Sequence, residues 1–378
     1  MRYRTLVLVI AAFFAFPILV AAQPTPPEIE GGTIVATGFN GPQGITIDAD
    51  GNLWVIDSGV GGDEEIPFIS EETGEPTTTK MGPSARIVMV SPDGEQTDVA
   101  ALPSIMASET EALGGARLTW MDGTLYATVG GWVGGAGDPP GLAGVVARVE
   151  GGDVTEVADM WAYEKANNPD GLTLEAHPYG ITAGPDGWLW IANAGANTLD
   201  RVNPETGEIQ NVAVFDGLPS PIANPARNSA MEADPVPTAV VFDDMGDALV
   251  SLLSGAPFVP GSAKVMRVTP NGEVSDFATG LTMLTDLQRG PDGELYAVEF
   301  GMFTEQGPVP NAGSVVRIHE GDTSEVLVSG LPFPTSLVFD ADGNAYVTIN
   351  GVGAPGSGAV VRFDALTGME GEPVPTGQ

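Results

Sequence analysis

The sequence has no cysteine, only two histidines and few basic residues, and these shortages exclude several classes of protein. Without cysteine, the 378-residue chain forms no disulfide, no zinc–thiolate site and no thiol nucleophile. Lys and Arg number 14 against 50 Asp and Glu, which gives a formal net charge of −36. Binding to nucleic-acid phosphates needs clustered basic side chains, so no nucleic-acid partner is expected. The same charge disfavours binding to an anionic membrane surface.

Long apolar runs are also missing, except near the N-terminus. Two arginines precede an apolar run over residues 6–20, and two alanines follow it. A charged start, a short apolar segment and small residues at its end are typical of a secretory signal peptide, here cleaved after Ala22. The alternative is an uncleaved membrane anchor, but the run is short for a membrane span and contains Pro17. We therefore expect an exported protein, secreted or periplasmic, that has no membrane association after cleavage.

The sequence does contain an internal repeat of short strands and tight turns. In each copy, a strand, an Asp-Gly-type turn and a second alternating strand are followed by a Gly-rich stretch, a third strand and usually a fourth. The turn glycines of the successive copies are Gly51, Gly123, Gly187, Gly246, Gly293 and Gly343. Six units of four strands predict an all-β fold, a six-bladed β-propeller with four-stranded blades.

The two ends of the repeat region predict how the propeller closes. The sixth unit lacks a fourth strand after Phe363, whereas a single strand begins at Thr33, before the first unit. This N-terminal strand is expected to complete the last blade and close the ring, which removes exposed strand edges. One helix is expected, over residues 159–169. The predicted organisation is a signal peptide (1–22), a flexible linker (23–32), the propeller (33–367) and a disordered tail (368–378).

Three segments carry a resemblance to a known family. They read HPYGITAGPDGWLWIANAGANTLDRVNPETGEI from His177, PVPTAVVFDDMGDALVSLLSGAPFVPGSAKVMRVTPNGE from Pro235 and LTDLQRGPDGELYAVEF from Leu284. The chain resembles the ScyD/ScyE family, exported propellers named after scytonemin pigment gene clusters, over residues 33–363. It is similar, more distantly, to NHL-repeat and streptogramin-lyase propellers. The resemblance implies the fold but supplies no agreed reaction and no catalytic residues.

Loop lengths predict which face of the propeller carries the function. The turns between first and second strands are tight, whereas the loops after second strands and the crossovers between units are long. The long segments are residues 59–83, 103–115, 130–144, 159–178, 218–237 and 300–313. Binding sites tend to lie on loops that a rigid scaffold holds, so we expect the loop-rich face to bind a ligand or partner.

Polar residues at the inner strand ends are the candidate metal ligands. Asp57, Asn193 and Glu299 end second strands, and Asp286 begins a first strand, so all four are expected around the mouth of the central channel. Carboxylate and amide oxygens from several blades suit calcium, and lactonase propellers offer an analogy. The alternative is a polar lining that bonds to backbone at the strand ends. Arg117 is expected at the same mouth, where it could pair with Asp286 across the channel.

Histidine and tryptophan supply the remaining candidates. A lyase needs a general base near neutral pH, and histidine is the usual residue. His177 lies in a crossover of the loop-rich face, whereas His319 is expected on the opposite face, so the two cannot cooperate. The alternative for His177 is an ordinary surface or capping residue. Trp132 and Trp161, in loops of the same face, are candidates for contact with a ligand.

Two DADGN segments, residues 48–52 and 340–344, are similar to calcium-binding loops. Their glycine comes one position too early for such a loop, and a strand follows at once, so we interpret them as hairpin turns. The sequence therefore predicts a monomeric propeller that binds a small molecule or an extracytoplasmic protein. The alternative is a calcium-dependent hydrolase or lactonase, or a streptogramin-lyase-like enzyme, with its site at the channel mouth.

Overall fold

The computed structural model describes residues 28–375 except 70–74, 109–110 and 305–306. The predicted signal peptide and the first half of the predicted linker, residues 23–27, lie outside the described residues. Within the part of the chain that the structure describes, no helix is long and apolar enough to span a membrane.

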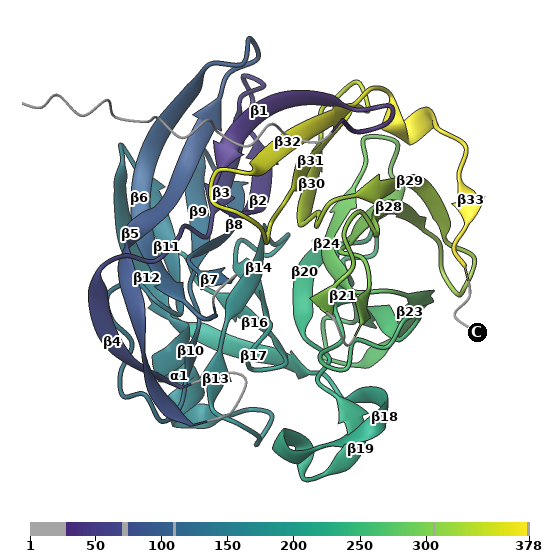
Figure 1. Cartoon of the computed structure of the whole chain (residues 1–378). Helices are drawn as coiled ribbons and strands as arrows, with labels where there is room; N and C mark the ends of the chain where they lie inside the picture. The colour runs from purple at the N-terminus through teal and green to yellow at the C-terminus, as the bar shows by residue number, and fades with distance from the viewer. Residues whose placement is uncertain (1–27, 70–74, 109–110, 305–306, 376–378) are drawn as a thin grey trace, which may run out of the picture.

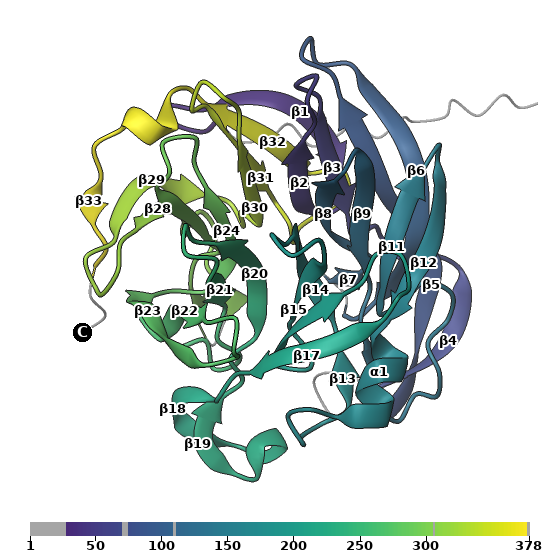
Figure 2. The same ribbon diagram turned by 180° about the vertical axis from the view of Figure 1, so that it is seen from behind.

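Six antiparallel sheets surround a common centre (Figures 1 and 2). Each of the first five contains four strands of one repeat unit, and the sixth contains three strands of its unit and the N-terminal strand. The first sheet is β2 (Pro42–Ile47), β3 (Leu53–Asp57), β5 (Pro76–Val90) and β6 (Gln96–Met106), with β7 (Ala112–Leu113) at its edge. The second is β8 (Gly115–Met121), β9 (Thr124–Val129), β11 (Val145–Glu150) and β12 (Asp153–Asp159). The third is β14 (Pro178–Ala183), β15 (Leu189–Asn193), β16 (Thr198–Val202) and β17 (Ile209–Val214).

The remaining three sheets repeat this order. The fourth is β20 (Pro237–Phe242), β21 (Ala248–Leu252), β22 (Ala263–Val268) and β23 (Val274–Leu281). The fifth is β24 (Leu284–Arg289), β25 (Leu295–Glu299), β28 (Gly313–Ile318) and β29 (Glu325–Leu331). The sixth joins β30 (Ser336–Phe339), β31 (Ala345–Ile349) and β32 (Gly358–Phe363) to β1 (Thr33–Phe39) from the N-terminal side. The fold is a β-propeller, as the repeats predicted.

The N-terminal strand lies in the last sheet. β1 pairs antiparallel with β32, with Thr33 opposite Arg362 and Phe39 opposite Gly358. Phe39 is fully buried in a cluster with Val88 of the first sheet. The innermost strand β2 also contacts β30, so the first and last units are neighbours.

The tight turns have the chemistry expected of hairpins. Asp48 accepts hydrogen bonds from the backbone N–H groups of Asp50 and Asn52, and Gly51 has a φ of 83°. The Asp340 turn repeats the pattern. These carboxylates are used within their own turns, which is how Asx-type turns stabilise a hairpin. The DADGN segments are therefore hairpin turns.

Both ends of the described chain contact the propeller. Ile29, in the predicted linker, is 9% exposed and packs in the core cluster of the fifth and sixth sheets. In the predicted tail, β33 (Glu372–Pro373) pairs with the outer strand β29. An apolar side chain and a strand edge thus give each of these two segments a contact with the propeller.

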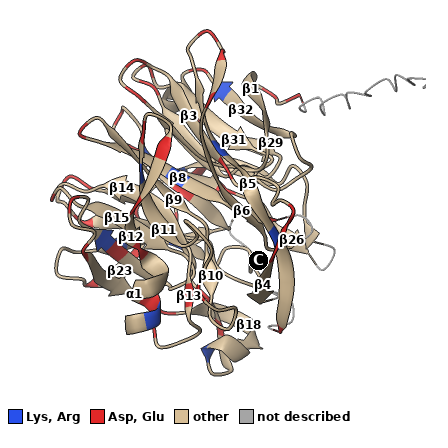
Figure 3. Cartoon of the chain, turned by 90° about the vertical axis from the view of Figure 1, so that its left-hand side faces the viewer, with Lys and Arg blue, Asp and Glu red and all other residues tan. Residues whose placement is uncertain are grey.

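Long segments of the loop-rich face form a partial cap rather than irregular loops. β4 (Glu64–Ile69) pairs with an extension of β5, β10 (Trp132–Val133) pairs with β13 (Glu175–Ala176), and β18 (Leu218–Asn224) pairs with β19 (Ala230–Ala233). Figure 3 shows β4, β10, β13 and β18 toward the same lower side of the molecule. The expected helix is α1 (Met160–Asn167), capped by the Asp159 carboxylate, which accepts a bond from the N–H of Ala162.

The two candidate tryptophans belong to the interior of this cap. Trp132 and Trp161 are each 3% exposed and lie in one apolar cluster with Phe68 of β4. The Trp132 ring packs edge-on against Phe68 at 6.0 Å between centroids, and its indole N–H donates to the carbonyl of Gly137. Both rings thus pack among apolar neighbours of the cap, and their contact with a ligand stays a prediction.

Candidate ligand-binding site

A cavity of about 540 Å³, here the central cavity, opens on the loop-rich face where the six sheets meet. Every sheet, or the loop after one of its strands, contributes to the lining. The larger apolar residues of the lining are Val60, Met106, Leu113, Val236, Leu253, Phe258, Met283, Phe300 and Phe303. The polar residues include Gln43, His177, Tyr179, Thr238, Thr285 and Thr335. The lining is therefore largely apolar, with a few polar groups.

Three aromatic rings form one wall of the central cavity. Phe258 comes from the β21–β22 loop, Phe300 follows β25, and Phe303 begins the short strand β26 (Phe303–Thr304). The Phe258 and Phe303 rings lie 4.6 Å apart between centroids, and Phe300 stacks on Phe303 at 6.2 Å. Offset aromatic contacts at these distances hold the rings in a defined arrangement. The wall is therefore a preformed apolar surface.

Arg117 lies at the inner end of the propeller, next to residues that line the central cavity. It is 4% exposed, and its guanidinium donates to the backbone carbonyls of Gln43, Thr285 and Thr335. These three carbonyls belong to the first, fifth and sixth sheets, whereas Arg117 belongs to the second. The guanidinium also lies 4.4 Å from the ring centroid of Tyr179, in the third sheet. Arg117 thus connects five of the six sheets.

The pairing of Arg117 with Asp286 is not present among the described residues. Asp286 instead accepts bonds from the Ser336 hydroxyl, at 2.6 Å, and from the N–H groups of Leu287 and Leu337. Through these bonds, the Asp286 side chain of the fifth sheet is linked to Ser336 and Leu337 of the sixth sheet. The sequence predicted that both residues lie at inner strand ends. It could not show that Arg117 and Asp286 each bond to backbone groups rather than to one another.

The other three predicted metal ligands hold the crossovers that precede first strands. Asp57 accepts the N–H of Asn40 and both the backbone N–H and guanidinium of Arg86. Asn193 and Glu299 accept, respectively, the N–H groups of His177 and Thr282, each at 2.9 Å. Burial raises the pKa of both Asp57 and Glu299 above their ordinary values.

The four predicted ligands therefore do not assemble into a calcium site. None of them lines the central cavity. Among the described residues, no group of three or more His, Asp or Glu side chains is placed to hold a metal ion. The carboxylate and amide oxygens bond to backbone at strand ends, which is the alternative that the sequence left open.

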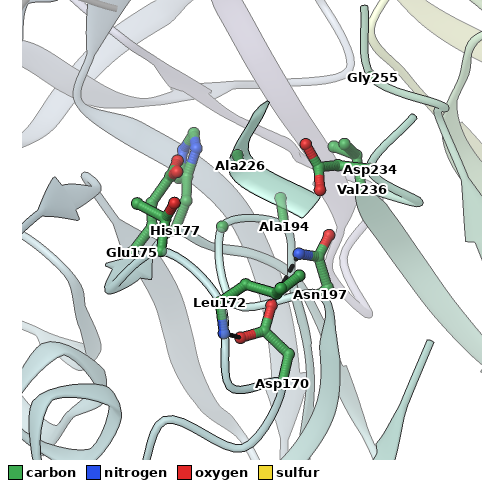
Figure 4. A pocket seen from close by; sticks show the side chains of 12 residues that line it. Asp170, Leu172, Glu175, His177, Ala194, Asn197, Ala226, Asp234, Val236 and Gly255 are labelled. Carbon is green, nitrogen blue, oxygen red and sulfur yellow. Dashed lines mark hydrogen bonds between the residues drawn. The ribbon is translucent and has the colours of Figure 1, made fainter. Parts of the chain in front are cut away.

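A second cavity of about 220 Å³, here the side cavity, lies between the third and fourth sheets (Figure 4). Its lining includes Asp170, Glu175, Asn197 and Asp234. His177, Ala194 and Val236 line both cavities, so the two cavities are neighbours at these residues.

His177 is the one predicted catalytic candidate that lies at a cavity. Its ring packs edge-on against Tyr179, at 5.6 Å between centroids. Burial lowers its pKa to about 4, so the ring is neutral at pH 7. His319 lies near Glu325 at 3.9 Å and lines neither cavity, consistent with the expectation that the two histidines are apart.

Sequence reasoning missed most of the residues that shape these cavities. Phe258 and Phe303 were not singled out, although Phe303 lies in the long segment 300–313. Asn197 and Asp170 were also missed, because an isolated Asn or Asp in a turn usually serves the turn itself. The loop lengths were the available signal. They pointed to the face on which the central cavity opens, but not to these residues.

Comparisons with known proteins agree on the fold. No family model and no curated protein match the chain. Aldose sugar dehydrogenase from Streptomyces coelicolor, solved in its PQQ-bound form, is 12% identical, with a TM-score of 0.51 and coverage of 90% of this chain and 99% of that one. Virginiamycin B lyase from Staphylococcus aureus is 17% identical, with a TM-score of 0.46. The match covers 86% of this chain and 95% of the lyase. Regucalcin, a calcium-binding protein from Agrobacterium tumefaciens, is 14% identical, with a TM-score of 0.47 and coverage of 91% and 95%.

The class that the fold defines is thus the β-propeller. Identities this low show the fold alone, because one propeller scaffold hosts many unrelated functions. The resemblance to the ScyD/ScyE family stays a prediction.

Proposed function

We propose that the protein is an exported ligand-binding β-propeller whose central cavity takes a small molecule with a largely apolar body. The observation that carries the proposal is the cavity itself: about 540 Å³, mostly apolar, with a few polar groups from different sheets. Small-molecule sites typically measure roughly 300–1,000 Å³ and have this kind of lining. A concave cavity favours a small molecule over an extracytoplasmic protein as the partner. Export rests on residues 1–22.

The lyase-like alternative depends on His177. A general base works best when its pKa lies near the working pH. The pKa of His177, about 4, makes the ring a weak base at neutral pH. The calcium-dependent alternative has no grouped ligands among the described residues. We therefore favour binding without catalysis.

The proposal is tested by thermal unfolding of the purified protein with a panel of small apolar and amphipathic compounds. A compound that binds only the folded state stabilises it, by about 2.7 kcal/mol at a hundredfold excess over Kd. The double variant Phe258→Ala/Phe303→Ala removes two rings of the aromatic wall and should abolish the shift. Phe277→Ala is the matched control, because Phe277 packs under Arg267 and does not line the cavity.

Three outcomes are informative. Loss of the shift in the double variant alone supports the central cavity as the site. A shift that survives in the double variant places binding elsewhere and contradicts the proposal. Chemical conversion of a bound compound would favour the enzyme alternative instead.

A further inference from the structure

The side cavity offers hydrogen-bond acceptors and negative charge to whatever enters it. Asp170, Glu175 and Asp234 contribute carboxylates, and no Lys or Arg is among the described residues that line it. Asp234 is paired with Arg227 at 3.1 Å, but Arg227 also binds Glu232, at 3.2 Å. The positive charge of Arg227 is therefore matched by its own two partners. Because this lining has three carboxylates and no Lys or Arg, it carries an excess of negative charge.

One acceptor in the side cavity is buried and has no donor. Asn197 is 5% exposed, and its amide Nδ2 donates to Asp170 Oδ2 at 2.9 Å. That bond fixes the orientation of the amide, since only the NH₂ group can donate to a carboxylate. Oδ1 then has no hydrogen-bond partner among the described residues. Figure 4 shows this oxygen directed away from Asp170, toward the part of the side cavity where Asp234 lies.

A buried acceptor without a donor is costly, so it indicates a missing group that donates. Asp170 is no donor to it, because both of its oxygens are acceptors: Oδ1 receives the N–H of Leu172 and Oδ2 receives the amide of Asn197. A donor with positive charge satisfies Asn197 and the carboxylates together. A neutral hydroxyl satisfies only the hydrogen bond.

We infer that the side cavity binds the ammonium group of the same ligand whose apolar body occupies the central cavity, an inference that rests on the proposed function. An ammonium group has three donors, which suits Asn197 Oδ1 and two carboxylates. The ligand reaches the side cavity past His177, Ala194 and Val236, which line both cavities. The low pKa of His177 leaves its ring uncharged at neutral pH, so the ring does not repel the cation. The ligand class is therefore a small amphipathic amine.

The test compares three probes of one shape by calorimetric titration: 4-phenylbutylamine, 4-phenylbutan-1-ol and 4-phenylbutanoate. The amine should bind about tenfold or more tightly than the alcohol, and the carboxylate most weakly, because hydrogen bonds to charged groups are stronger than neutral ones. This comparison uses the unaltered protein and needs no variant to fold.

Asp170→Asn tests the site itself. The variant removes one charge and keeps a side-chain oxygen that can accept the N–H of Leu172. Its amide can donate to Asn197 Oδ1 once the Asn197 amide turns over, so the two side chains still bond to each other and Oδ1 is no longer free for a ligand. The variant should reduce the preference for the amine to about threefold or less and leave the affinity for the alcohol unchanged. Asp122→Asn is the matched control: it removes the same charge at the exposed β8–β9 turn, where φ is 49°, a conformation that Asn also adopts. Ala194→Leu adds bulk at a residue that lines both cavities and should weaken the amine more than the alcohol.

The outcomes separate this inference from the proposed function. Equal affinities for amine and alcohol would overturn the inference and leave the central cavity as an apolar site. Binding of none of the three probes counts against both. If calcium chloride alone raises the unfolding midpoint, and Asp170→Asn abolishes that rise, the side cavity binds a metal ion and the inference fails.

Discussion

At the scale of single residues, Arg117 is a buried cation that has no carboxylate partner among the described residues. Its charge is stabilised by carbonyl dipoles from three sheets and by the face of the Tyr179 ring. Arginine suits this position because its planar group holds several donors in fixed directions, whereas lysine concentrates its charge at one atom. The position needs the geometry of the guanidinium as much as its charge.

Arg117→Lys should therefore lower the stability markedly. The ammonium reaches fewer of the carbonyls, and each buried carbonyl left without a donor costs about 1–3 kcal/mol. We expect a decrease of about 2–4 kcal/mol in the free energy of unfolding, measured with urea and tryptophan fluorescence. The control is Arg289→Lys at an exposed pair with Asp244, which should change stability by less than about 0.5 kcal/mol. Equal effects of the two substitutions would contradict the role of Arg117.

Glu164 of α1 is a buried acid beside other acids. It is 1% exposed, and burial, together with the charges of Asp170 and Asp200, raises its pKa from 4.5 to about 8. The folded state then keeps a proton that the unfolded state releases between these two values. Stability from this residue is complete below pH 4.5 and falls as the pH rises toward about 8.

Glu164→Gln isolates this pH dependence, because glutamine is neutral at every pH. The unfolding midpoint of the unaltered protein, relative to that of the variant, should be higher at pH 5 than at pH 8. Thermal unfolding at both pH values, in buffers of equal ionic strength, measures the difference. A constant difference between the two proteins would show that Glu164 ionises normally.

At the scale of elements, β1 contributes both a strand edge and a core side chain to the sixth sheet. Phe39 is 0% exposed and packs in one cluster with residues of the first and sixth sheets. Removing a buried phenylalanine side chain costs its transfer free energy and leaves a cavity.

Phe39→Ala should therefore cost about 3–5 kcal/mol in the free energy of unfolding, measured with urea. Thr33→Ala, at the exposed start of the same strand, is the control and should have an effect within about 0.5 kcal/mol. If Phe39→Ala is equally mild, β1 does not contribute to the core as the structure shows.

The elements that the sequence predicted are those set by local rules. Alternating apolar residues and turn glycines such as Gly51 predicted the repeated strands, because hairpin geometry depends on neighbouring residues. β4 was missed because Ile66 and Phe68 stand among charged residues, and their burial depends on Trp132, far along the chain. The cavities were missed because their linings also combine residues that lie far apart in the chain. Whether Asn197 Oδ1 has a partner depends on its contact with Asp170, which no spacing in the sequence indicates.

At the scale of the whole molecule, the dominant feature is the net charge of −36. Figure 3 shows Asp and Glu on many strands and turns, with far fewer Lys and Arg. Like charges on a compact molecule repel one another and destabilise it. Salt screens this repulsion, since the Debye length falls from about 30 Å at 0.01 M to about 3 Å at 1 M. Salt also weakens exposed ion pairs such as Arg86–Asp98, but each such pair contributes little.

We therefore expect the thermal unfolding midpoint to rise between 0.01 M and about 1 M sodium chloride. Potassium chloride should have the same effect, because screening depends on ionic strength. Calcium chloride at matched ionic strength should add no further rise, given that the described acidic residues form no metal-binding group. A midpoint that falls with sodium chloride would show that attractive ion pairs outweigh the repulsion.

The pairing of β1 with β32 also constrains how the molecule is assembled. Thr33 and Arg362 lie opposite each other, although roughly 330 residues separate them in the chain. Contacts this distant in sequence form slowly, because the intervening chain must be brought together first. During synthesis, β1 is the first of the propeller's strands to be made, and it stays without its partner until the residues of β32 have left the ribosome. The nascent propeller therefore has an open edge for almost the whole of its translation, and a chain that stops short of β32 cannot acquire a complete sixth sheet.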